Sequence, residues 1–354
     1  MRTLIPSLAI AALSVGLYLA GLLTFADRAF MEGRFALLQR DASLEIAIVA
    51  IDPGSLQKIG VWPWPREFHA RLLDRLRELG VRRIGYDIDF SAQSTAEQDR
   101  RLKNALAAHS PPVILPAFRQ FSKPQGSDEL IASLPLPLLA QHATVASINV
   151  RPDSDGVVRR VEPIQNFDEV ILPFMAARLA TARDVRQATF YLDYGIRADT
   201  IPVYAFADVL IGGGENLAGR DILVGSTAVE LGDQLAVPRY AALPGVVVQA
   251  LAYESLVQNR ALAPLPPWLV AFATLMVTMA ALFVMAQYRW RGASLVLAAA
   301  ATLVIGASFA LQATAPTFVD VAPLLLAALL SYGVTLVRTI GRQEENILQA
   351  TADA

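Results

Sequence analysis

Three aspartates lie at or just after the ends of apolar segments of the sequence. Their carboxylates could hold a cation or a polar ligand there. The run Ile46–Ile51 is followed by Asp52, and a second run over residues 83–90 contains Asp87 and Asp89. Hard cations prefer carboxylate oxygens, so the three could bind a metal ion or a ligand's hydroxyl or amine groups. Alternatively, they cap the helices that follow or hydrogen-bond the next loop. Asp87 and Asp89 would face the same way if both lie in a strand.

An aromatic stretch, Trp62-Pro63-Trp64-Pro65-Arg66, lies between the two runs. The faces of Trp62 and Trp64 could receive apolar or cationic groups, and Arg66 could hold an anion at the start of a helix. The alternative is a stiff structural corner, in which Arg66 pairs with Asp52 or Asp87 and the indoles fill the core.

A histidine follows this stretch, three residues after Arg66. Catalysis by His69 would require an activated nucleophile beside it, and Ser55 is the nearby candidate in the sequence. No third group that could orient the histidine is identifiable from spacing. A structural or capping role for His69 is therefore the favoured interpretation.

The surrounding pattern predicts a parallel β-α-β unit. Two short apolar runs, residues 46–51 and 83–90, enclose a segment, 66–79, with apolar residues at helical spacing. We expect the three aspartates at the carboxyl ends of neighbouring strands, the edge where open α/β sheets bind ligands.

The rest of the polar region continues the alternation of strands and helices. Residues 119–133 are predicted to form a surface loop, and Asp155-Gly156 indicates the turn of a hairpin. Predicted helices cover residues 96–108, 172–182, 203–211 and 244–258; predicted strands cover 112–118, 144–150, 157–165, 189–194 and 221–224.

Composition indicates a membrane protein. Of the 354 residues 54% are hydrophobic, and the mean hydropathy is +0.42. Four apolar segments approach the roughly 20 residues that a spanning helix needs, at 4–26, 267–285, 293–311 and 319–337. A cleavable signal peptide is the alternative for the first. The net charge of −2 gives no indication of a nucleic-acid partner, and the lack of cysteine excludes disulfides and thiolate chemistry.

The basic residues beside these segments predict their orientation. Arg2, Arg289, Arg291, Arg338 and Arg342 flank the ends that the positive-inside bias places in the cytoplasm. Both termini are then cytoplasmic, and residues 27–264 lie outside an inner (plasma) membrane that the chain crosses four times.

Motifs spread over residues 30–260 resemble the second type of CHASE domain, the cyclases/histidine kinases associated sensory extracellular domain. They are the WPWPR stretch with Asp52, Ser55 and His69-Ala70 around it, Gly80, DIDF at 87–90, DSDGVVRR at 153–160, ILVGSTA at 222–228, Asp233, Pro238 and Pro244-Gly245. The resemblance implies a sensory domain after one span and before three more. It also implies a cytoplasmic output module, such as a nucleotide cyclase, diguanylate cyclase or kinase, for which the tail after residue 338 is too short.

Our prediction is an α/β extracytoplasmic sensor domain with a mostly parallel sheet and four transmembrane helices. The expected divisions are an anchor (1–26), the sensory domain (27–264), three membrane helices (265–338) and a cytoplasmic tail (339–354). We expect no catalysis or cofactor in this chain. Expected partners are a small-molecule or envelope ligand, membrane lipid, an output module and a second copy in a homodimer.

The ligand-site candidates are Asp52, Ser55, Trp62, Trp64, Arg66, His69, Asp87 and Asp89. The alternative function is a metal-dependent extracytoplasmic hydrolase that uses Asp52, Asp87, Asp89 and His69. A structural membrane protein without a ligand is the third possibility.

Overall fold

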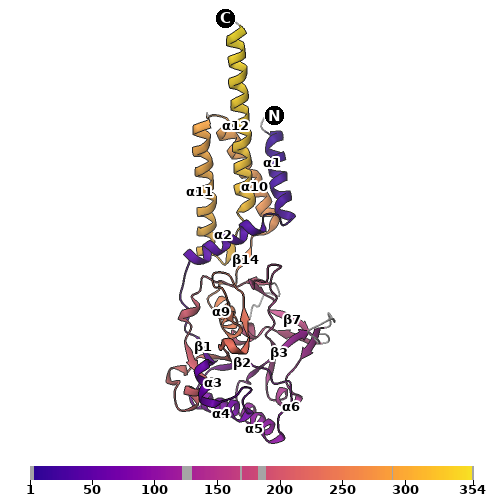
Figure 1. Ribbon diagram of the computed structural model, residues 1–354, viewed down its shortest axis with the longest axis vertical. Coiled ribbons are helices and arrows are strands. Elements are labelled where there is room, and N and C mark those ends of the chain that lie inside the picture. Colours follow the sequence, from indigo (N-terminus) through magenta and orange to yellow (C-terminus); the bar gives the residue numbers. More distant parts are fainter. Residues whose placement is uncertain (1–3, 122–129, 168–169, 182–188, 289, 353–354) are drawn as a thin grey trace. The chain divides into compact units, whose positions relative to one another are not determined.

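The computed structural model describes residues 4–121, 130–167, 170–181, 189–288 and 290–352. The chain forms two compact units (Figure 1). A helical unit comprises Met1–Leu38 and Ala263–Ala354, and an α/β unit comprises Gln39–Leu262. The α/β unit is thus inserted in the sequence between two helices of the other unit.

A seven-stranded sheet forms the centre of the α/β unit. Its order is β10-β1-β11-β2-β3-β4, with β5 also paired to β3, and all pairs are parallel except β3 with β4. The strands are β1 (Ile46–Ile51), β2 (Arg83–Asp87), β3 (Ile114–Phe121), β4 (Leu130–Ser133), β5 (Thr144–Ser147), β10 (Val203–Ala205) and β11 (Asp221–Ser226). All six residues of β1 are buried, as expected for a strand covered on both faces.

The predicted pairing of β1 with β2 is wrong, because β11 lies between them. Ile48 aligns with Leu223, and Leu223 aligns with Gly85 on the other side. The three strands are parallel, so their carboxyl ends still meet at one edge. The two strands of the β-α-β segment, β1 and β2, are therefore not adjacent, and β11, from much later in the sequence, pairs with both.

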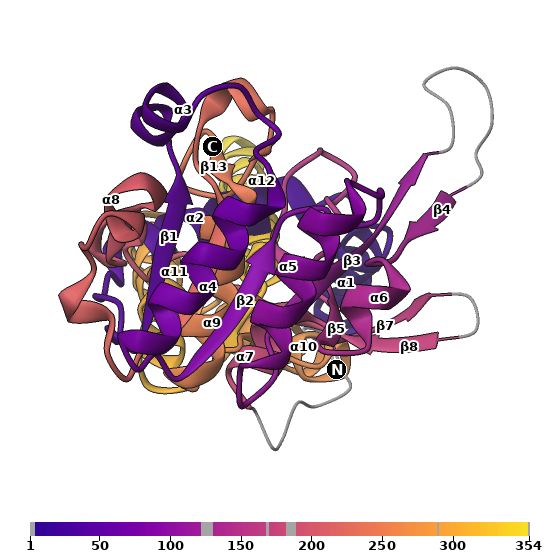
Figure 2. The same cartoon turned by 90° about the horizontal axis from the view of Figure 1, so that it is seen from below.

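Helices cover both faces of this sheet. Figure 2 shows α4 (Arg66–Glu78) and α5 (Ala96–Ala107) on one face, and α7 (Met175–Leu179) and α9 (Gly245–Val257) on the other. Alternate strand residues and the buried side of α4, including Leu72, Leu73 and Leu76, form the main core. Shorter elements are α3 (Pro53–Ile59), α6 (Pro137–Ala140), α8 (Phe206–Leu210) and 3-10 turns at Ala198–Thr200, Glu215–Leu217 and Val229–Leu231.

Several predicted elements differ from the structure. The turn at Asp155-Gly156 exists, since the Gly156 amide donates to the Asp153 carbonyl at 2.9 Å, but its flanking segments do not pair with each other. Instead β5 pairs with β3, β6 (Arg160–Val161) with β9 (Phe190–Tyr191), and β7 (Ile164–Phe167) with β8 (Val170–Pro173).

The helix predicted over 203–211 is divided between strand β10 and helix α8, and the helix predicted over 172–182 is shortened to α7 after strand β8. The predicted loop 119–133 instead contributes to β3 and β4 at its two ends, while its centre, 122–129, lies outside the described residues. A further short pair joins β12 (Gln234–Leu235) and β13 (Leu243–Pro244).

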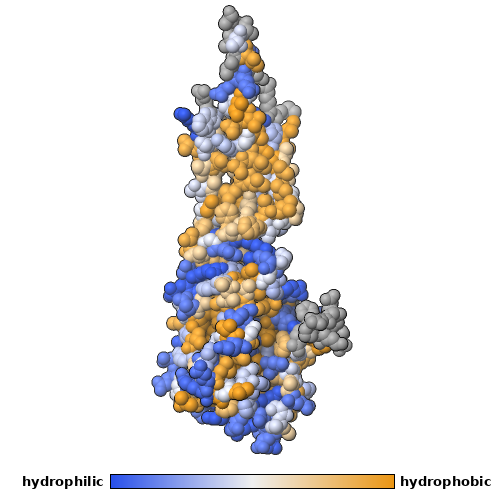
Figure 3. Space-filling model, in the orientation of Figure 1, coloured by the Kyte–Doolittle hydropathy of each residue, from blue (hydrophilic) through white to orange (hydrophobic). Residues whose placement is uncertain are grey.

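The helical unit contains α1 (Leu4–Leu19), α2 (Thr24–Leu37), α10 (Pro267–Met285), α11 (Trp290–Thr314) and α12 (Ala322–Ala352), with a small pair of β14 (Ala263–Pro264) and β15 (Thr317–Phe318). By length and composition, α10, α11 and the first part of α12 could each cross a membrane. Figure 3 shows that the visible surface of these helices is predominantly apolar.

The first apolar segment does not form one straight helix over 4–26. It breaks after Leu19 at a turn in which Gly21 has φ +75°, and α2 leaves at 79° to α1. Within this unit, α2 runs across the other helices (Figure 1). Within the residues that the structure describes, the number of candidate spans is three, or four if the bent pair counts as one.

Candidate functional site

His69 lies in a cage of aromatic rings between α4 and the sheet. It is 2% exposed, and burial, with the nearby Arg66 charge as a second cause, lowers its pKa to about 3. Five ring centroids lie 5.3–6.5 Å from its own, those of Trp62, Trp64, Tyr86, Phe90 and Phe206. The imidazole is therefore neutral and packed, and its Nδ1 has no hydrogen-bond partner among the described residues.

Ser55 and Asp52 belong to the start of α3. Asp52 is the N-cap, and its carboxylate accepts from the Ser55 amide at 2.9 Å. The buried Ser55 hydroxyl oxygen accepts from the Ala207 amide at 3.0 Å. Asp52 thus caps a helix, as the alternative interpretation expected. The hydroxyl of Ser55 is bonded to α8 and not to the imidazole of His69.

The tryptophan–proline loop forms a corner in which Trp64 and Arg66 are buried. The Trp64 indole N–H donates to the Gly60 carbonyl at 3.0 Å, and Trp62 packs edge-on against Trp64. Arg66 pairs with the buried Asp99 of α5 and donates to the carbonyl of Ala92. The expected pairing of Arg66 with Asp52 or Asp87 is therefore wrong, because the guanidinium lies against α5.

Asp87 faces the opposite side of the sheet from Tyr86, because successive strand residues alternate in direction. On that side, a Cβ at Gly225 of β11 would lie 2.7 Å from Val246 of α9 and 3.2 Å from the Cβ of Asp87. Burial, with the charge of Asp233 as a second cause, raises the pKa of Asp87 to about 7. Gly225 therefore lets β11 and the start of α9 close around Asp87.

Asp233 approaches the N-terminus of α9 in a similar way. A Cβ at Gly245, the first residue of α9, would lie 2.6 Å from both carboxylate oxygens of Asp233. Burial raises the pKa of Asp233, while a hydrogen bond from the Gly245 amide opposes the rise. Asp87 and Asp233 thus form a carboxylate pair beside a helix N-terminus, where partial positive charge favours anions.

Asp89 does not join this pair. Strand β2 ends at Asp87, so the alternation assumed for residues 87 and 89 stops, and the exposed Asp89 accepts from the Ser91 amide at 2.7 Å. Among the described residues no three Asp, Glu, His or Cys side chains converge as metal ligands would. The structure leaves the four residues of the hydrolase alternative apart, with His69 and Asp87 on opposite faces of the sheet.

Two further buried carboxylates connect the beginning and the end of the α/β unit. Asp193 accepts from Arg260 Nε at 2.9 Å, and Arg40 Nε lies 3.7 Å from the same oxygen. Glu254 of α9 accepts from the amide and the hydroxyl of Ser43 at 2.8 and 2.9 Å. We call these contacts the root of the α/β unit. Sequence reasoning missed them, because their residues lie far apart along the chain.

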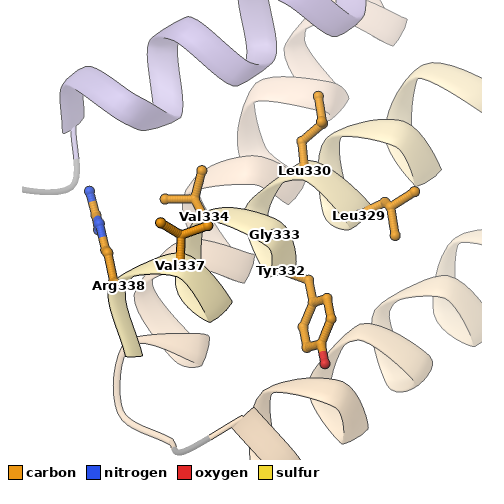
Figure 4. Close-up of a pocket in the computed structure, with 7 residues that line it drawn as sticks. All are labelled: Leu329, Leu330, Tyr332, Gly333, Val334, Val337 and Arg338. Carbon is orange, nitrogen blue, oxygen red and sulfur yellow. The ribbon is translucent and has the colours of Figure 1, made fainter. Parts of the chain in front are cut away.

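The helical unit contains an apolar cavity of about 640 Å³ along α12, between Leu329 and Arg338 (Figure 4). Leu329, Leu330, Gly333, Val334 and Val337 line it, with Tyr332 and Arg338 as the polar contributors. No convergent set of polar groups faces this space among its lining residues, so it suits an apolar occupant.

The fold defines an α/β protein that also carries helices long and apolar enough to cross a membrane. A family model, that of the CHASE2 domain, matches residues 8–285. The chain therefore belongs to the CHASE2 family, a family of extracellular sensor domains, which confirms the resemblance that the motifs indicated. Comparisons with curated proteins and with solved structures gave no match.

Proposed function

We propose that this chain is a membrane-bound receptor that senses a ligand outside the cell membrane and passes the signal to a cytoplasmic output module. The observation that carries the proposal is the CHASE2 α/β unit inserted between apolar helices, with its two chain ends bonded to each other at the root. The output would be a nucleotide cyclase, diguanylate cyclase or kinase, and a homodimer would bring two such modules together.

Helix α9 connects the proposed sensing edge to segments that continue along the chain into the helical unit. Its N-terminus lies beside Asp233 and near Asp87, and its thirteen residues extend about 20 Å at 1.5 Å each. Near its other end Glu254 holds Ser43, at the beginning of the α/β unit. A ligand that moves the start of α9 would therefore move the segments that continue into α2 and α10.

The ligand we propose is small and carries hydroxyl or cationic groups, because carboxylate oxygens accept hydrogen bonds from both. Asp87 and Asp233 are its central contacts, and the sequence-derived candidates Asp52 and Asp89 lie after strands at the same edge. Such a ligand changes signalling only by binding one of two arrangements of the receptor more tightly. Membrane lipid is a second expected partner, with the apolar cavity on α12 suited to an acyl chain.

The proposal requires the α/β unit outside and the end of α12 inside. The sequence contains no cysteine, so single cysteines at the exposed Gln57 of α3 and the exposed Gln343 of α12 can be labelled without background. In intact cells, a membrane-impermeant maleimide should label Gln57→Cys, and should label Gln343→Cys only after permeabilisation. The reverse preference would reject an outward-facing sensor.

A further inference from the structure

Helix α2 contributes a buried carboxylate to the helical unit. Asp27 is 7% exposed, and its Oδ1 accepts from the Ala322 amide at the start of α12 at 2.8 Å. Its Oδ2 is inaccessible to solvent and has no hydrogen-bond partner among the described residues. A buried carboxylate oxygen without a partner costs several kcal/mol, so an occupant that satisfies it would be favoured.

The charges around Asp27 do not balance. Among the described residues, Asp320 and Arg34 are the charged groups whose fields act on it, and the amides of Val321 and Ala322 at the start of α12 both stabilise its ionised form. Asp320 accepts a hydrogen bond from the Tyr18 hydroxyl of α1 at 3.0 Å. Two carboxylates and one guanidinium leave one negative charge, which the partial charge of a helix N-terminus offsets only in part.

Arg34 does not neutralise this charge by direct contact. The guanidinium is 1% exposed, and its Nε donates to Gln312 Oε1 of α11 at 2.7 Å. Its NH1 lies 3.5 Å from the Ser308 hydroxyl. The hydrogen bonds of Arg34 to Gln312 and Ser308 thus hold α2 to α11, whereas the bond of Asp27 to the Ala322 amide holds α2 to α12.

We propose that Asp27 Oδ2 binds one small positive charge, a monovalent cation or a proton, at a site completed by Asp320. A proton would come from solvent and convert the carboxylate to the acid, while a cation would leave it ionised. In both cases the occupant completes the contact between α2 and α12. The site goes beyond the proposed function, because it does not depend on what the α/β unit senses.

The test measures thermal unfolding of the purified full chain in detergent, at constant ionic strength, with sodium, lithium or potassium replacing N-methylglucamine across pH 5–9. We expect a saturable rise in Tm of about 2–6 °C, since ligands that bind only the folded state stabilise it. A rise with sodium or lithium at fixed pH identifies a cation. A rise with falling pH that ignores the cation, and that is larger in wild type than in Asp27→Asn, identifies a proton at Asp27.

The variants show whether Asp27 is responsible. Asp27→Asn should remove the cation response, or the part of the pH response that Asp27 adds to that of Asp87, and Glu344→Gln, at an exposed carboxylate of α12, should behave like wild type. Asp320→Asn should weaken the response, because it removes the second carboxylate whose charge acts on Asp27. This variant decides the matter if Asp27→Asn does not fold. Parallel responses of wild type and a folded Asp27 or Asp320 variant to both cation and pH would overturn the proposal.

Discussion

Replacing Asp87 by asparagine should flatten the dependence of stability on pH. Burial and the charge of Asp233 raise the pKa of Asp87 to about 7, whereas an unfolded aspartate titrates near 3.9. The folded chain therefore binds this proton more tightly than the unfolded chain. Its contribution to stability is complete below about pH 4 and is lost as the pH rises through 7. Asparagine stays neutral throughout and cannot show this loss.

The size of the effect follows from the two pKa values. Between pH 5 and pH 8, a shift from about 3.9 to about 7 corresponds to roughly 2.6 kcal/mol of unfolding free energy. Asp87 is only partly shielded from solvent, so we expect about 1–2.5 kcal/mol. For a unit of this size that is a difference in Tm of about 2–8 °C.

The assay needs a signal from the α/β unit alone. Of the four tryptophans, Trp62 and Trp64 lie there, and Trp268→Phe with Trp290→Phe silences the others. In this background, fluorescence melts of the full chain should show wild type losing stability from pH 5 to 8 and Asp87→Asn losing less. Asp89→Asn, two residues further at an exposed carboxylate, is the matched control and should follow wild type. Equal slopes for Asp87→Asn and wild type would refute the argument.

Three further predictions test how the α/β unit is held together. Arg66→Ala should lower the unfolding free energy by about 3–5 kcal/mol in chemical denaturation, because it leaves the buried carboxylate of Asp99 unpaired. The control Arg101→Ala, at an exposed ion pair, should lower it by less than about 1 kcal/mol. Gly225→Ala should lower the unfolding free energy by about 1–3 kcal/mol, because the added Cβ forces β11 and α9 apart. The control Gly33→Ala, where nothing lies within 4 Å of the added Cβ, should be neutral or slightly stabilising. A Gly225→Ala variant with wild-type Tm would contradict this packing. Glu254→Gln should lower the Tm and the unfolding free energy of the α/β unit, the latter by about 1–3 kcal/mol, because a carboxylate binds the two Ser43 donors more strongly than a neutral amide does. An unchanged Tm would show that this contact does not stabilise the unit.

Elements set by local pattern could be predicted from the sequence. The predicted starts of β1, α4 and β2 agree with the structure, because buried runs and helical spacing are local signals. The pairing of β1 with β2 failed because β11 supplies the intervening strand from far along the chain. Val203 and the two residues after it form β10 rather than helix, because pairing with the distant strand β1 outweighs the local tendency toward helix.

The candidate site was predicted less completely. The sequence predicted the edge of the sheet and Asp87 as candidates, which stay a prediction, and Asp233 appeared among the motifs of the resemblance without a role. Its proximity to α9 depends on an irregular segment after β11 and on the missing side chain of Gly245, which only the fold reveals. Gly21 was the available signal for the break after α1, although single glycines are tolerated within membrane helices.

The position of β11 also dictates when this unit can fold. It is the last strand of the main sheet to be synthesised, yet it hydrogen-bonds to β1 and to β2, which emerge near the beginning. Until residues 221–226 arrive, the apolar β1 has an unpaired edge beside an incomplete core, a condition that favours aggregation. A fragment that ends before Asp221 therefore lacks the centre of its sheet and leaves edges of β1 and β2 unpaired.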